Sequence, residues 1–385
     1  MRDQLKYFPV NWIDGMKITK NHFVDQDNAF RNALHDAASF GLSPYRYGVL
    51  PPSARAENTF SVKISSDNQN TIKVDVQVCQ AVTSGGARIS IPALAAPVAT
   101  TADTGLTAFF PFNALDGDMD WWIVLVVHPY DTQPAGSPDL SENPPRYPYA
   151  LPTHVIQLVS AKTYAQYTYH PYALTIGKLF VNGSEIILED YYIPPCISVS
   201  AHQDLISLLG EFDEFFASLE KYCTVILQKI FKKNQQNNLS ELVLFLCDRI
   251  MIYLSEALTS IRWMALHESP ASLFITMATL ARLIKNTMLV RAGSGRDELM
   301  NYLSEWCDLK KGELESLLNS ISNIVYEHND VNKNISEAAV FVKVINRLFK
   351  TLSKLEFIGE PKSSGLFVHE EQEKVPKNSK RRFLG

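Results

Sequence analysis

Three aspartates at alternate positions are the residues of this chain that most suggest metal chemistry. Asp116, Asp118 and Asp120 alternate in LDGDMDWW as the first carboxylates of a calcium loop do. Such a loop also needs a glycine at its sixth position, for the turn, and a bidentate glutamate at its twelfth. Those positions hold Trp121 and Val127. The pattern therefore favours a polar turn before a buried strand over a calcium site.

The other residues that could bind a metal or catalyse a reaction do not have the spacing that such sites require. The histidines do not pair at ligand spacings, so His128, His154 and His170 would form a metal site only if folding brought them together. Neither AGSGRD nor NGSEI has the Gly-x-Ser-x-Gly elbow of a serine hydrolase, and no glycine loop for phosphates occurs. We predict no catalytic residue, no cofactor and no metal. A hydrolase with an unrecognised site is one rival hypothesis.

Length and composition favour a multidomain intracellular protein. A chain of 385 residues exceeds one typical core, and a net charge of -5 argues against nucleic-acid binding. The five cysteines are far apart and lie mostly in apolar runs, which predicts buried thiols in a reducing compartment. The first residues lack the apolar core of a signal peptide, and no apolar run approaches about 20 residues. We expect a cytoplasmic protein that does not insert into a membrane.

Between about residue 45 and residue 195 the sequence has the period of β-strands. Apolar and polar residues alternate in TIKVDVQV, which predicts that one set lies on the buried face of an antiparallel sheet: Ile72, Val74, Val76 and Val78. WWIVLVV (121–127) is apolar at every position and predicts a central strand. Prolines are dense in 128–152, which predicts a long surface loop. Strands at this spacing indicate a β-sandwich.

After residue 200 the period becomes that of a helical bundle. Large apolar residues recur every seven positions in two stretches, and these are candidate core residues: Leu205, Phe212, Leu219, Ile226, Ile345 and Leu352. We expect helices near 201–233, 239–266, 270–291, 296–328 (broken around Gly312) and 334–357. Asn238 with Glu241, and Asn334 with Glu337, have the spacing of capping boxes. The sequence thus predicts an α+β multidomain chain, with a sandwich followed by an antiparallel bundle.

Four regions follow from these changes of pattern. We expect an N-terminal arm and helix in 1–40, a β-sandwich domain in 41–195, a helical bundle in 196–358 and a flexible basic tail in 359–385. The adjacent prolines Pro194 and Pro195 would stiffen a hinge between sandwich and bundle, because two φ angles are fixed. The tail could dock on a partner through its basic run and the aromatic residue after it: Lys380, Arg381, Arg382 and Phe383.

Three stretches in order resemble one family. PVNWIDGMKITKNHFVDQDNAF (9–30) resembles its Trp-x-Glu-Gly-Met start and the Gln-His-Phe that follows, although Asp14 replaces the usual glutamate. YYIPPC (191–196) resembles its junction at the entry to the helices, and IRWMALHESPASLFITMATLARLI (261–284) its His-x-x-Pro helix junction. The family is TssK, the baseplate subunit of type VI secretion systems, and the similarity covers nearly all of 1–358.

The resemblance implies a structural role. It implies a trimeric, non-enzymatic baseplate adaptor, with a sandwich akin to the shell of phage receptor-binding proteins and a bundle that trimerises. Such an adaptor connects baseplate wedge subunits to the membrane-associated complex at the inner face of the cell envelope. Members normally carry a further C-terminal domain, where this sequence has 27 residues after 358; we expect other subunits, or the tail, to make the membrane-side link.

The resemblance also gives the N-terminal segment a role. Its large apolar residues would anchor an arm on the chain's own sandwich or on a wedge subunit: Trp12, Met16, Ile18 and Phe23. Packing within the chain is an equally good explanation for any one of them. A second rival function is recognition of a glycan or protein, as in phage receptor-binding proteins.

Overall fold

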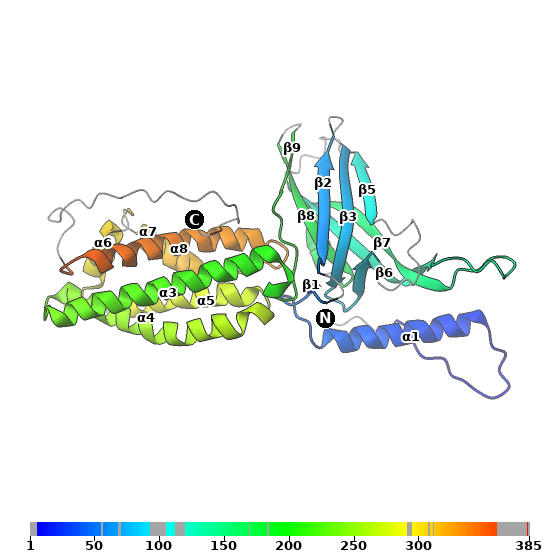
Figure 1. Cartoon of the computed structure of the whole chain (residues 1–385), viewed down its shortest axis with the longest axis horizontal. Coiled ribbons are helices and arrows are strands. Elements are labelled where there is room, and N and C mark those ends of the chain that lie inside the picture. The colour runs from blue at the N-terminus through cyan, green and yellow to red at the C-terminus, as the bar shows by residue number, and fades with distance from the viewer. Residues whose placement is uncertain are drawn as a thin grey trace. The chain divides into compact units, whose positions relative to one another are not determined.

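The computed structural model describes residues 6–359, except 55–56, 68–70, 93–104, 112–119, 169, 183–184, 291–294, 307–308 and 311, and also describes Phe383. The chain forms two compact units (Figure 1). The first is Met1–His202 with His328–Asp330, and the second is Gln203–Glu327 with Val331–Gly385. The first unit therefore extends beyond the boundary expected after residue 195. Sheets followed by helices confirm the predicted α+β class.

The first unit is a sandwich of two antiparallel sheets, preceded by the helix α1 (Lys20–Ser39). In one sheet the long strand β3 (Thr71–Val82) pairs with four others: β1 (Gly48–Val49), β2 (Phe60–Ser66), β4 (Arg88–Ile91) and β5 (Leu106–Pro111). The second sheet has the order β7-β6-β8-β9, from β6 (Asp120–Ala135), β7 (Tyr149–Ser160), β8 (Ala173–Asn182) and β9 (Glu185–Leu188). A short helix, α2 (Ala161–Thr168), follows β7. The apolar run WWIVLVV lies in β6, between β7 and β8, so its predicted central position is confirmed.

The core between the sheets follows the predicted alternation up to a bulge. Ile72, Val74 and Val76 are fully buried and pack with residues of the second sheet such as Ile123 and Leu125. Val78 does not continue the set, because the register against β2 shifts and Cys79 takes the inward position instead. An extra residue in one strand reverses which side chains face the core beyond it. The prediction for Val78 was therefore wrong.

The proline-rich stretch 128–152 is only partly a loop. Strand β6 runs on to Ala135 and β7 begins at Tyr149, and these extensions pair from Thr132 with Pro152 to Ala135 with Tyr149. A register shift after His128 separates this pairing from the main sheet. Prolines are tolerated there because no other strand of the described ranges pairs with the extension and would need an N–H from it. We call residues 129–152 the β6–β7 extension. The prediction of a surface loop across the whole of 128–152 was therefore wrong.

The second unit consists of α-helices close to the predicted ranges. They are α3 (Gln203–Lys232), α4 (Asn238–Trp263), α5 (Ala271–Leu289), α6 (Arg296–Trp306), α7 (Glu313–Ser322) and α8 (Val331–Lys354). Helix α3 packs against α4 and α8, and α5 against α4 and α7. Gly312 precedes α7 with a φ of 85°, a conformation that suits glycine, so the expected break falls there. Among the described helices, none is long and apolar enough to cross a membrane.

Candidate functional site: an apolar arm and helix beside a groove

Helix α1 is attached to the sandwich by one polar and aromatic face. The Arg31 guanidinium donates to the carbonyl oxygen of Pro129 at 3.3 Å, and the Tyr130 hydroxyl donates to Asn32 Oδ1 at 3.1 Å. The His35 ring lies 6.0 Å from the rings of both Tyr130 and Tyr172. Only Asn28 and Ala29 of α1 are buried. The helix therefore contacts the sandwich along a narrow strip and leaves most of its circumference uncovered.

Burial shifts the pKa values of His35 and Tyr130, two of the residues that attach α1 to the sandwich. The pKa of His35 is lowered, first because burial disfavours the charged ring and then because Arg31 is nearby. Burial raises the pKa of Tyr130, and the contact with Tyr172 adds to the shift. Both rings thus stay uncharged near neutral pH. The attachment relies on packing and hydrogen bonds between neutral rings, with Arg31 as its charged member.

The uncovered face of α1 is apolar. Phe23, Phe30 and Leu34 are exposed by 57%, 60% and 67%, and their spacing of seven and four residues puts them on one side of the helix. Isolated exposed apolar residues are normal, but a stripe of large ones is typical of a surface that binds another protein. The small residues Ala33 and Ala37 flank the stripe and would let a partner approach closely.

The N-terminal arm, residues 6–19, extends this surface. The Trp12 ring lies 6.1 Å from the Phe23 ring and 6.2 Å from the His22 ring, and Val10 N donates to Gln26 Oε1 at 3.0 Å. Trp12 is still 46% exposed, and three further apolar side chains of the arm are exposed: Phe8, Ile13 and Ile18. We call the exposed apolar side chains of the arm and of α1 the arm–helix surface.

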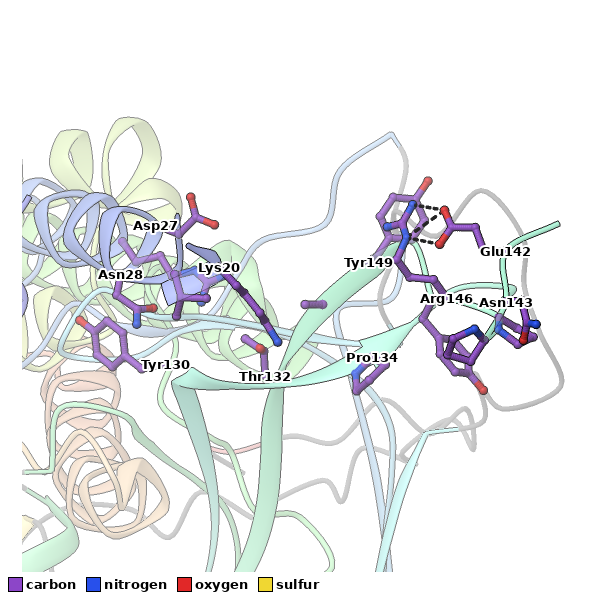
Figure 2. Close-up of a pocket in the computed structure, with 16 residues that line it drawn as sticks. Lys20, Asp27, Asn28, Tyr130, Thr132, Pro134, Glu142, Asn143, Arg146 and Tyr149 are labelled. Carbon is purple, nitrogen blue, oxygen red and sulfur yellow. Dashed lines mark hydrogen bonds and ion pairs between the residues drawn. The ribbon is translucent and has the colours of Figure 1, made fainter. Parts of the chain in front are cut away.

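A groove of about 770 Å³ lies between α1 and the β6–β7 extension (Figure 2). On the helix side it is lined by Lys20, Val24, Asp27, Asn28 and Arg31. On the other side it is lined by prolines, tyrosines, Thr132 and the ion pair Glu142–Arg146, in which the guanidinium donates to both carboxylate oxygens. Asn28 is buried, with 6% of the residue exposed, and its amide forms no hydrogen bond among the described residues.

A second polar cluster in the first unit is closed. The Tyr47 hydroxyl donates to Asn329 Oδ1, the Tyr192 hydroxyl to Asn329 O, and Lys178 forms an ion pair with Asp330 at 3.0 Å. His328 Nε2 lies 2.9 Å from the Tyr47 carbonyl oxygen. These groups satisfy one another within the core, as buried polar groups usually do, and leave no open site. The cluster is structural.

The metal candidates do not converge in the described residues. No group of three or more His, Cys, Asp or Glu side chains is placed to hold an ion in the described ranges. His128 lies near His154, whose pKa is lowered first by burial and then by the neighbouring His128 ring. Asp116 and Asp118 lie outside the described residues, and Asp120 begins β6. Four cysteines are buried free thiols, and burial raises the pKa of Cys79 to about 12.

The wedge candidates come together as one surface, with one exception. Trp12, Ile18 and Phe23 are exposed parts of the arm–helix surface, whereas Met16 is half-buried. Sequence reasoning missed Phe30 and Leu34, although the seven-residue spacing from Phe23 could have revealed them. It also missed the groove, because the hairpin residues opposite α1 were assigned to a loop.

The other candidate residues lie elsewhere. Pro194 and Pro195 are buried in the first unit, where Val49 N donates to Pro195 O at 2.8 Å, so the hinge stays a prediction. The six bundle candidates are all buried within a single chain, and their role at a trimer axis stays a prediction: Leu205, Phe212, Leu219, Ile226, Ile345 and Leu352. Lys380, Arg381 and Arg382 lie outside the described residues, while Phe383 N donates to both carboxylate oxygens of Glu211.

Comparisons with known proteins gave structural matches alone. No family model matches the chain, and no curated protein is significantly similar to it. The chain is similar to a crystal structure of TssK, with 13% identity over 90% of this chain and 69% of that one and a TM-score of 0.48. It is also similar to chains of a type VI secretion TssK-TssF-TssG baseplate subcomplex (13% identity, 90% and 100% covered, TM-score 0.41) and of a type VI baseplate complex (14%, 89% and 99%, 0.45).

Proposed function

We propose that this chain is a non-enzymatic structural adaptor of a type VI secretion baseplate, and that it binds wedge subunits through the arm–helix surface. The observation that carries the proposal is the apolar stripe of α1, continued by Trp12 on the arm. Leaving several large side chains in water is costly, at roughly 25 cal/mol per Å² of apolar area. A partner that covers them recovers this free energy, which favours a binding role for the surface.

Two further observations support the same proposal. The three sequence motifs that resemble the TssK family occur in the family's order, and the first of them is the segment that forms the arm and the start of α1. The order of the two units, sandwich and then helices, agrees with what that resemblance implies. TssF and TssG, named with one of the similar structures, are the partners to test.

The finer parts of the proposal follow from the resemblance. The adaptor works as a homotrimer in the cytoplasm, at the inner face of the cell envelope, and connects the wedge to subunits of the membrane-associated complex. Three copies would present three arm–helix surfaces, and repeated weak sites raise the effective concentration at every attachment. No catalytic step is part of this function.

Replacing Trp12 with alanine tests the docking role. Trp12 is the largest side chain of the arm–helix surface, and truncation of such an anchor at an interface often costs 2 kcal/mol or more, about thirtyfold in affinity. We expect capture of co-expressed TssF and TssG homologues by the W12A variant to fall at least tenfold. The measurement is affinity capture with quantitative immunodetection, on protein whose circular dichroism matches that of the unmodified chain.

Trp263 provides a matched control in the second unit. It is 78% exposed, so W263A removes an equally large surface side chain without touching the arm. Capture by W263A should equal that of the unmodified chain. Unchanged capture by a folded W12A protein, or an equal loss in both variants, would contradict the assignment of the wedge-binding surface.

A further inference from the structure

The C-terminal end of the chain meets helix α3 at Glu211. Phe383 N lies 2.7 Å from one carboxylate oxygen of Glu211 and 3.0 Å from the other, so a single backbone N–H donates to both. A hydrogen bond to an ionised acceptor is roughly twice as strong as one between neutral groups. Both residues are partly buried and both belong to the second unit. The contact therefore joins the last residues of the chain to a helix of the same unit.

The charges of the two segments are complementary. The first 18 residues of α3, Gln203–Glu220, hold five acidic side chains and no lysine or arginine. One of the five, Asp213, is paired with Arg262. In the sequence, three basic residues come directly before Phe383. Opposite charges a few ångströms apart attract even at a solvated surface, so this part of α3 favours the C-terminal segment over a neutral one.

The segment that follows α8 is held at the other end of α3. Gln235 Oε1 accepts from Ile358 N at 2.9 Å, and Asn237 Nδ2 donates to Ile358 O at 2.8 Å. Gly359 N donates to the Tyr302 hydroxyl at 3.1 Å. Ile358 is buried, with 3% of the residue exposed. The chain is thus fixed to the α3–α4 turn at Gly359 and contacts α3 again at Phe383.

The distance between these two contacts is well within the reach of the chain. The part of α3 from Glu211 to Lys232 is roughly 32 Å long, at 1.5 Å per residue. The 24 residues 360–383 would span roughly 80 Å if fully extended. A tether that exceeds the span of its two sites keeps the bound end at a high effective concentration, of the order of millimolar. A weak site on α3 is therefore enough to hold the C-terminal end.

We propose that the α3 surface around Glu211 is a binding site for the C-terminal segment of the same chain, with Phe383 as the residue held there. We call this contact the C-terminal latch. While it is closed, the end of the tail is occupied by its own bundle. A partner that takes up this end has to displace Glu211, and so has to offer its own acceptor for the Phe383 N–H and a negatively charged surface. The latch is independent of wedge binding by the arm–helix surface.

Amide hydrogen exchange in the full chain tests the latch. The probe is the Phe383 N–H, read by mass spectrometry with fragmentation of the C-terminal peptide. Exchange in the unmodified chain should be at least about tenfold slower than in the Glu211→Ala variant, because E211A removes the carboxylate that accepts this N–H. Glu211→Gln keeps an acceptor oxygen without the charge, so E211Q should retain part of the protection.

Glu214→Ala is the matched control. Glu214 is exposed on the same helix, three residues further along, so E214A removes the same charge from α3 and leaves the acceptor in place. Exchange of the Phe383 N–H in E214A should equal that in the unmodified chain. Circular dichroism and the melting temperature show that the variants are folded, and substitutions at such partly exposed positions usually change stability by less than about 0.5 kcal/mol.

Co-expression of two variants separates a latch within one chain from an exchange of tails between copies. One chain carries E211A, with its tail intact but the seat removed. The other carries Phe383→Pro, with its seat intact but no N–H to donate at that position. The two chains carry different tags and are purified through both. If each tail binds its own chain, the Phe383 N–H of the E211A chain stays unprotected in this sample.

Three outcomes would overturn the proposal. Equal exchange in E211A and the unmodified chain would show that Glu211 does not hold Phe383. The same loss of protection in E211A and E214A would assign the effect to the overall charge of α3. Protection of Phe383 restored in the co-expressed pair would assign the seat to the tail of a second copy. None of these measurements involves TssF or TssG, so their results are separate from the capture experiment with W12A.

Discussion

His328 shows how far burial changes one residue. It lies in the first unit with its Nε2 2.9 Å from the Tyr47 carbonyl oxygen, and its ring packs edge-on against Tyr47 at 4.6 Å. Burial lowers its pKa from 6.5 to about 4, and the hydrogen bond to Tyr47 opposes this only in part. The folded state therefore holds the ring neutral where an unfolded chain would protonate it.

This shift predicts a loss of stability in mild acid. Because the folded pKa is depressed, the contribution is fully present above pH 6.5 and is lost as the pH falls toward 4. Between pH 7 and pH 5 the loss is about 2 kcal/mol for this group. We expect the urea-unfolding free energy of the H328Q variant to fall by about 2 kcal/mol less over this range than that of the unmodified chain. Parallel pH profiles for the two proteins would show that His328 is not held neutral.

At the scale of elements, the strand β1 is held by a close approach of two backbone segments. Val49 N donates to Pro195 O at 2.8 Å, and Ile197 N donates to Val49 O at 3.0 Å. Gly48 has a φ of 109°, and a Cβ there would lie 1.9 Å from Pro195 O. Only glycine fits, because neither the backbone angle nor the space admits a side chain.

Gly48→Ala should therefore destabilise the first unit strongly. The strained φ and the clash together predict a cost of about 3 kcal/mol or more. Gly41→Ala is the matched control in the same unit, because its nearest contact would be 3.8 Å away and its φ is not in the left-handed region. It should change stability by less than about 0.5 kcal/mol. The urea midpoint, followed by tryptophan fluorescence, gives both values; equal midpoints for the two variants would refute the close packing of β1.

Helix starts show where reasoning from spacing misplaces a cap. Asn237, not Asn238, caps α4, since its Oδ1 accepts from Ser240 N at 2.7 Å. Asn334 is not a cap; it is buried inside α8, where its side chain bonds Glu327 N and Val325 O. Neither predicted cap, Asn238 or Asn334, is therefore correct, although Asn237 and Asn334 both satisfy backbone groups with their side chains. The backbone groups that each side chain bonds depend on how the segment before the helix folds against it. Spacing in the sequence does not reveal this.

At the scale of the whole molecule, the mass in solution tests the assembly. If three copies associate, light scattering will give three times the chain mass of 43.3 kDa. A mass of one chain at every concentration would contradict the trimer. Leu219→Ala is informative here, because Leu219 is fully buried within its own chain. It should cost about 2 to 5 kcal/mol of stability. An unchanged mass of the folded protein would place Leu219 in the core of its own chain alone. A changed mass would place Leu219 at a contact between copies.

The sequence by itself determined the order of the two units, the central position of the strand WWIVLVV and the core stripes of the helices. Each of these depends on residues close in the chain, whose period of two or of 3.6 shows which face is buried. Only the tertiary structure decided that a bulge turns Val78 away from the core, that β6 and β7 continue into the proline-rich stretch, and that Asn28 faces a groove. Each of these features lies where two segments distant in the chain meet. The register of two strands and the surroundings of a side chain depend on the segment opposite, which a local pattern does not specify.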